Sequence, residues 1–132
     1  MIVSLHVATG ACVGAAVRTR AAALLLGPLL HLAGDRMPHE DIDSRVFEIG
    51  SGVALVALLA TRRGPLDPAT LAALATAAPD GEHVLPVPRL RGRKLFPSHR
   101  FERWHRAGGL SAPAQLLAAG LALGVLLAPR RR

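Results

Sequence analysis

Several residue types are scarce in this chain of 132 residues, and each shortage excludes a class of protein. Cys12 is the only cysteine, so a disulfide-stabilised scaffold is excluded. Aromatic residues make up only 3%, which argues against single-stranded nucleic acid binding because such binding needs aromatic stacking platforms. Hydrophobic residues nevertheless reach 51%, which excludes a disordered chain. The length fits one domain, residues 1–132.

Acidic residues are also scarce, with nine Asp and Glu against sixteen Lys and Arg, a net charge of +7 and a pI near 11.6. Such a surplus suits an anionic partner: nucleic acid, anionic lipid or a phosphorylated substrate. Nucleic acid is not expected, because the basic residues form no continuous helical stripe. Mean hydropathy is +0.35, which in a small basic chain favours a membrane protein with charges at the ends of apolar segments.

Five apolar segments organise the chain, and all are predicted to be helical. Alanine and leucine dominate them, and they show neither period-2 alternation nor β-branched runs. Asp67 followed by Pro68 is a typical start signal for the fourth segment. The segments are Ile2–Val17, Ala21–Gly34, Val46–Thr61, Ala69–Ala78 and Ala112–Ala128.

These segments favour an all-α fold, a small integral membrane bundle of four to five helices in the cell (inner) membrane. Their length argues the other way, because a span needs about 20 apolar residues and at least about 17. A small soluble helical bundle is therefore the alternative. Val53–Ala60, however, has no polar position, whereas a bundle of this size needs polar outer faces. The membrane bundle, with one long polar loop over about 79–109, is the expected architecture.

Six of the nine acids lie in two short segments that also hold histidine. In the first, His31 and Asp35 are spaced i and i+4 and share one helix face, and a proline then lets His39 turn back toward them. In the second, Asp80 precedes His83 by three residues in a turn. If successive helices cross the same layer in alternating directions, every histidine falls toward one side.

Imidazole and carboxylate ligands without thiolates suit Zn²⁺, Mn²⁺ or Fe²⁺. We expect a divalent metal site, with zinc as the first candidate and with two ions bridged by a carboxylate as an open alternative. Glu48 is interpreted as a favourable charge at a helix N-terminus, with a ligand or base as the alternative. The expected metal ligands are His31, Asp35, His39, Asp80 and His83.

These motifs resemble the family of membrane-bound metal-dependent hydrolases, also described as LexA-binding inner-membrane hydrolases. The family's Pro-Asp-x-Asp-His motif is similar to Pro79–His83, with Glu82 in place of the second Asp. Its His-Arg-x-x-x-His motif is similar to His99 and Arg100 with His105. Its Ser-His-x-x-x-Asp motif is similar to Leu30–Asp35, and its early histidine corresponds to His6.

The resemblance implies a metal-dependent hydrolase, here of a phosphoester or a lipid-linked substrate. His99 or His105 would complete the ligand set or act as general acid or base. Arg100 and Arg106 would orient an anionic group of the substrate. The alternative is a non-catalytic membrane protein whose basic loop docks anionic lipid or a protein partner, and in which the histidines are structural.

Overall fold

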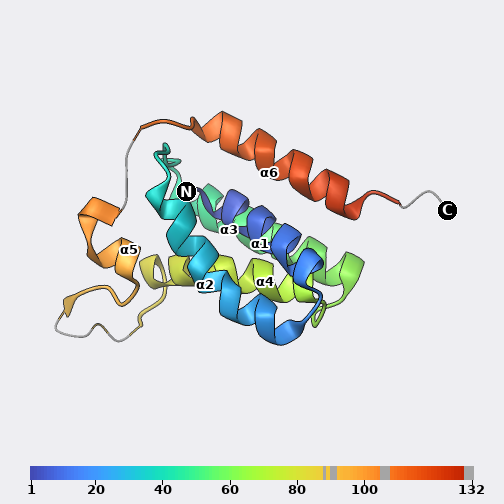
Figure 1. Ribbon diagram of the computed structural model, residues 1–132. Coiled ribbons are helices and arrows are strands. Elements are labelled where there is room, and N and C mark those ends of the chain that lie inside the picture. The colour runs from blue at the N-terminus through green and yellow to red at the C-terminus, as the bar shows by residue number, and fades with distance from the viewer. Residues whose placement is uncertain (88, 90–91, 105–107, 130–132) are drawn as a thin grey trace.

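The five apolar segments are helices in the computed structural model, which describes residues 1–87, 89, 92–104 and 108–129 (Figure 1). This confirms the predicted all-α fold. Strong helix formers fill these segments, so local propensity and the observed structure agree. The helices are α1 (Val3–Val17), α2 (Arg20–Arg36), α3 (Arg45–Arg63), α4 (Pro68–Ala77) and α6 (Ala112–Leu127).

Side-chain caps fix where three of these helices begin. Asp67 caps α4 as its sequence predicts, because its Oδ1 accepts the Ala69 N–H over 2.8 Å and Pro68 occupies the first helical position. Thr19 caps α2 and Ser44 caps α3 through their hydroxyl oxygens. These caps satisfy N–H groups that have no partner within the helix.

The long polar segment is also structured where it is described. It begins with the 3₁₀ helix η1 (Ala78–His83), which continues directly from α4, and it contains α5 (Pro97–Arg100) and η3 (Glu102–Trp104). Both η1 and α5 contact α2. The polar segment therefore covers one end of the bundle, beside the chain's first residues (Figure 1).

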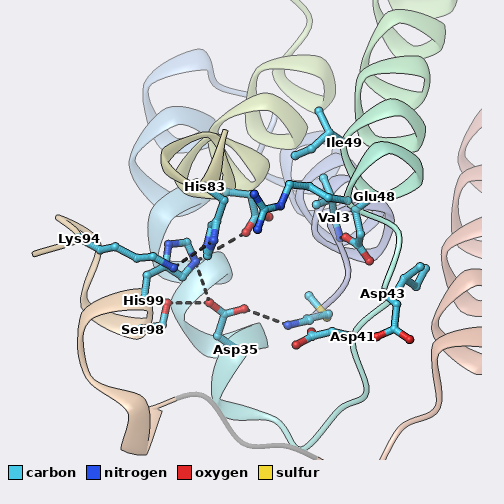
Figure 2. Close-up of a pocket in the computed structure, with 14 residues that line it drawn as sticks. Val3, Asp35, Asp41, Asp43, Glu48, Ile49, His83, Lys94, Ser98 and His99 are labelled. Carbon is cyan, nitrogen blue, oxygen red and sulfur yellow. Dashed lines mark hydrogen bonds and ion pairs between the residues drawn. The ribbon is translucent and has the colours of Figure 1, made fainter. Parts of the chain in front are cut away.

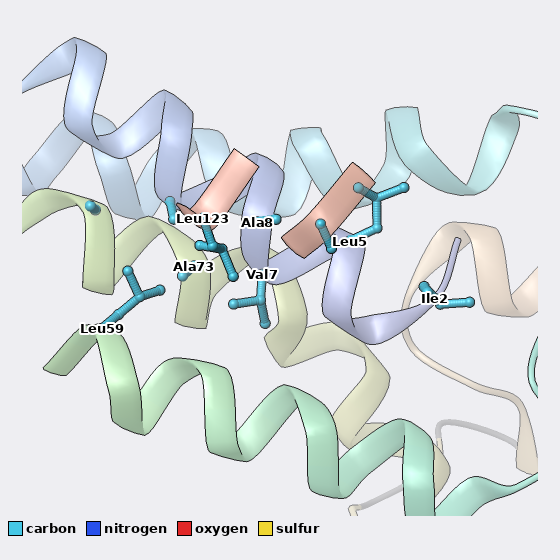
Figure 3. Close-up of a cluster of buried hydrophobic side chains, with 10 residues drawn as sticks. Ile2, Leu5, Val7, Ala8, Leu59, Ala73 and Leu123 are labelled. Carbon is cyan, nitrogen blue, oxygen red and sulfur yellow. The ribbon is translucent and has the colours of Figure 1, made fainter. Parts of the chain in front are cut away.

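The core forms around α1, which packs most extensively against α4 and also contacts α2, α3 and α6. Figure 3 shows side chains of α1 meeting Leu59 of α3, Ala73 of α4 and Leu123 of α6. Many buried residues are alanines, so the helix axes can approach closely. Both α1 and α4 are apolar around most of their circumference because other helices surround them.

The prediction of an integral membrane bundle in the cell membrane is wrong. Among the described residues, every helix is either too short or too polar to cross a bilayer. The 15 residues of α1 and the 16 of α6 rise only about 22–24 Å, against a hydrocarbon core of about 30 Å. The 19 residues of α3 include four charged side chains. In α1 and α4 the apolar sequence reflects burial within the bundle, whereas α6 leaves Leu117, Leu121 and Val125 exposed.

The close packing of α1 against α4 at Gly10 leads to a testable prediction. A Cβ atom at Gly10 would lie 2.5 Å from Thr76 Oγ1 and 2.6 Å from the Ala72 carbonyl oxygen. We expect Gly10→Ala to lower the free energy of unfolding by about 1–3 kcal/mol, because backbone must shift to admit the methyl group. Urea denaturation measures this change.

Gly120→Ala is the matched control, because Gly120 lies in α6 and a Cβ there would meet no atom within 4 Å. We expect this substitution to raise the free energy of unfolding by about 0.5–1 kcal/mol through helix propensity. Equal effects of the two substitutions would contradict the close packing of α1 on α4.

Candidate metal centre

Four side chains from three elements converge at the end of the bundle that the polar segment covers. His31 and Asp35 lie one turn apart in the last part of α2, Asp80 lies in η1, and His99 lies in α5. Figure 2 shows Asp35 and His99 pointing toward one another from their separate elements. The i, i+4 spacing of His31 and Asp35 places both on one face of α2, as the sequence predicts.

The potential ligand atoms lie at nearly uniform separations. His31 Nε2 is 3.0 Å from Asp35 Oδ2, 3.2 Å from His99 Nε2 and 3.8 Å from Asp80 Oδ1. His99 Nε2 is 3.6 Å from both Asp35 Oδ2 and Asp80 Oδ1. Four ligands that hold zinc at about 2.0–2.2 Å in a tetrahedron are about 3.3–3.6 Å apart. Two sets of three atoms, one with Asp35 and one with Asp80, each together with His31 and His99, therefore have the spacing of ligands on one metal ion.

Both imidazole rings turn their Nε2 atom toward this centre. His31 Nδ1 donates to the Thr76 carbonyl oxygen over 2.8 Å, and His99 Nδ1 donates to Glu82 Oε1 over 2.7 Å. In a neutral ring the proton is then on Nδ1, so each Nε2 carries a lone pair. Two lone pairs face each other at 3.2 Å beside two carboxylate oxygens. Only a shared cation, either a proton or a metal ion, satisfies this arrangement.

Glu82 fixes the orientation of His99. Its carboxylate also accepts the Leu95 N–H over 2.8 Å and the Phe96 N–H over 3.2 Å. Burial alone would raise the pKa of Glu82, but these hydrogen bonds and that of His99 outweigh burial and lower the pKa. A carboxylate behind a ligating histidine is a typical outer partner in metal sites.

Asp35 is the most heavily bonded carboxylate of the centre and is 2% exposed. His6 Nε2 donates to its Oδ1 over 3.0 Å, and the Ser98 hydroxyl donates to its Oδ2 over 2.6 Å. The His6 ring stacks on His31 with centroids 4.0 Å apart. Burial opposes ionisation of Asp35, but its contacts with His31 and His6 and the N-terminal ammonium 3.0 Å from Oδ1 hold its pKa well below the usual range.

The pKa of Asp80 is shifted in the opposite direction from that of Asp35. Its Oδ2 is buried and has no hydrogen-bond partner in the described part of the chain. Burial raises the pKa of Asp80 to about 7. Burial also lowers the pKa of His99, so this ring stays neutral. A cation at the centre would stabilise the ionised Asp80, because opposite charge compensates for lost solvation.

The centre opens onto a cavity of about 420 Å³. Asp35, Asp80 and His99 form part of its wall, with Lys94 and His83 beside them (Figure 2). The facing wall comes from the start of α1, the segment before α3 and the first turns of α3. It carries apolar side chains together with Asp41, Asp43 and Glu48. The cavity has the size of a small-molecule site.

Two of the predicted metal ligands lie beside the four converging atoms. His83 packs edge-on against His99, with ring centroids 4.3 Å apart, and its Nδ1 is 3.1 Å from the Lys94 ammonium. His39 Nδ1 donates to the Met37 carbonyl oxygen over 2.7 Å. His39 Nε2 contacts the Met1 amine and lies 3.2 Å from Asp41 Oδ1. The structure thus brings His31, Asp35 and Asp80 together and places His39 and His83 around them.

The residues predicted to act in catalysis and substrate binding are placed differently. His99 joins the four converging side chains. Arg100 is exposed, and its guanidinium carbon lies 5.4 Å from the centre of the Phe101 ring, so the charge does not line the cavity. His105 and Arg106 lie outside the described residues.

Sequence reasoning missed Ser98, the Thr76 carbonyl and the full role of Glu82. Glu82 was visible as the acid within Pro79–His83, but nothing showed that it reaches α5. The sequence gives no sign of a role for Ser98 other than its position directly before His99. A backbone carbonyl carries no sequence signal at all.

Comparison with known proteins finds no matching family model, no matching curated protein and no matching solved structure.

Glu48 gives a prediction that does not depend on metal. It lies in the first turn of α3, where its Oε2 accepts the Val3 N–H over 3.0 Å, while its Oε1 is buried without a partner among the described residues. Burial raises the pKa of Glu48 above its usual 4.5. The folded protein therefore holds this proton more tightly than the unfolded chain, and stability falls as pH rises above 4.5.

Glu48→Gln should remove this penalty and keep an acceptor for the Val3 N–H. We expect variant and wild type to be equally stable below pH 4.5, and the variant to become the more stable one as pH rises. Urea denaturation at several pH values measures the difference, with Glu40→Gln as an exposed control. A gap that stays constant with pH would contradict the assignment.

Proposed function

We propose that the chain binds a divalent metal ion through His31, Asp35, Asp80 and His99, and that it is a metal-dependent hydrolase of a phosphoester. One observation carries the metal site. Asp35 Oδ2 and Asp80 Oδ1 each lie 3.0–3.8 Å from the Nε2 atoms of His31 and His99, and both rings have their other nitrogen already bonded. This donor set of two imidazoles and two carboxylates suits zinc first, and manganese or iron second.

The surrounding residues support a reactive rather than a closed centre. Asp80 has an unpartnered carboxylate oxygen, and the ligand atoms of Asp80 and His99 border a cavity large enough for a small substrate. When bound there, a zinc ion would supply Lewis-acid chemistry, stabilising negative charge on oxygen and making water a nucleophile near neutral pH. The resemblance to membrane-bound metal-dependent hydrolases agrees with this reaction class.

The chain's own residues have distinct roles in this proposal. Glu82 and the Thr76 carbonyl hold His99 and His31 in the tautomers that can ligate a metal. His6 and Ser98 hold the Asp35 carboxylate in place. Glu48 lines the same cavity with a raised pKa, so it is the side chain best suited to accept or donate a proton during hydrolysis.

Metal binding is the first test. We expect the purified wild-type protein to bind one equivalent of Zn²⁺ after chelator treatment and reloading. Asp35→Asn and Asp80→Asn should each reduce the affinity at least about 100-fold, since each removes an anionic ligand from a buried site. Elemental analysis and competition with a chromophoric chelator give the stoichiometry and the affinity.

Asp43→Asn is the matched control, because Asp43 lines the cavity but lies outside the four converging groups. It should leave the stoichiometry unchanged. Wild-type protein without stoichiometric metal would instead favour the non-catalytic alternative, in which the histidines only stabilise the fold.

The role of Glu82 gives a second test. Glu82→Gln removes the negative charge behind the His99 ring and leaves one acceptor oxygen in place of two. That oxygen can serve either Leu95 or the pair of Phe96 and His99. We expect zinc affinity to fall about 10- to 100-fold, the usual loss when an outer carboxylate is neutralised. Glu40→Gln, an exposed change of the same charge, should have no effect. Unchanged affinity in Glu82→Gln would refute this role.

A further inference from the structure

The cavity has a basic side that the metal ligands do not use. Lys94 lines it, and the Lys94 ammonium donates to His83 Nδ1 over 3.1 Å. The His83 ring accepts this hydrogen bond and has no negative charge, so it holds the lysine without forming an ion pair with it. The full positive charge of Lys94 remains available beside the metal centre.

Arg45 reaches the cavity from the first turn of α3, and its charge acts on His83, beside Lys94. Neither Lys94 nor Arg45 forms a salt bridge with a described carboxylate; the described arginine that does is Arg63, which pairs with Asp67 at the other end of α3. Yet the cavity lining includes five carboxylates. Two unpaired cations in a partly enclosed cavity are favourable for an incoming anion, because screening by solvent is weaker there.

The acidic side chains are separated from this basic side. Figure 2 shows Lys94 and His83 beside His99, whereas Asp41, Asp43 and Glu48 lie on the other side of the cavity, with Glu48 next to Val3. Asp35 and Asp80 belong to the metal centre, where bound metal would offset their charge. An anionic group is thus favoured next to Lys94 and disfavoured on the far wall. The far wall suits an uncharged or apolar substituent, since Val3, Ile42 and Ile49 also line it.

We propose that Lys94, assisted by Arg45, is the binding site for the phosphoryl group of the substrate, and that the substrate carries no second anionic group. This inference rests on the proposed metal-dependent function, and it names the class of ligand: a phosphoester whose remaining part is uncharged. It also replaces Arg100 with Lys94 and Arg45 as the groups that orient the anion. Lys94 donates to phosphate as a compact charge, and Arg45 as a planar fork.

Binding of inorganic phosphate to the Co²⁺-loaded full chain tests this proposal without knowledge of the substrate. The visible spectrum of bound Co²⁺ first reports whether the metal site is formed, and its change on titration then gives the phosphate affinity. We expect Lys94→Met to leave the initial spectrum intact and to weaken phosphate binding about tenfold, the effect of losing one charge-assisted hydrogen bond. Arg45→Met should weaken phosphate binding several-fold.

Arg93→Met is the matched control, because Arg93 is exposed, precedes Lys94 directly and does not line the cavity. It should change the phosphate affinity by less than about twofold. Acetate should bind far more weakly than phosphate to the wild type.

These measurements distinguish a failure of the metal site from a failure of the anion site alone. Absence of a Co²⁺ spectrum in the wild type would overturn the metal site and the anion site together. A normal Co²⁺ spectrum with no response to phosphate would overturn the anion site alone. So would equal phosphate affinities in Lys94→Met, Arg45→Met and Arg93→Met.

Discussion

The buried carboxylate of Asp35 is the interaction on which the rest of the site depends. An ionised carboxylate that is 2% exposed is costly unless it is fully bonded. The N-terminal ammonium of Met1, His6 of α1 and Ser98 of α5 supply those bonds to Asp35 of α2. One charge thus joins the first helix, the second helix and the polar segment, and it sets where α5 docks on the bundle.

Part of this site could be read from sequence because its spacing is local. His31 and Asp35 lie one helical turn apart, and Asp80 follows the helix α4 that packs against α2. The helices themselves were predictable from Ala and Leu content and from the Asp67–Pro68 cap. What sequence could not give is which histidine completes the set. Asp80 and His83 both line the cavity, but His83 lies against Lys94 and His99, and His99 of α5 presents its Nε2 to the centre.

The membrane prediction failed for a physical reason that the packing of α1 and α4 shows. A helix surrounded by other helices needs no polar face, so its sequence resembles that of a short membrane span. Gly10 and a series of buried alanines allow α1 to approach α4 closely, and this close contact buries both helices with few large side chains. Amino-acid composition shows that such residues avoid water, but it does not distinguish a membrane span from a helix buried by other helices. Helix length against bilayer thickness distinguishes the two environments here.

The centre also links charge to folding. The Nδ1 atoms of His31 and His99 are committed to Thr76 and Glu82, so their Nε2 atoms face two carboxylates with nothing of their own to donate. Without metal, a proton must be shared there, and Asp80 accommodates this because burial raises its pKa to about 7. A metal ion would displace that proton and ionise Asp80. Since the four ligands come from α2, η1 and α5, metal binding would hold the polar segment against the bundle and stabilise the fold as well as the site.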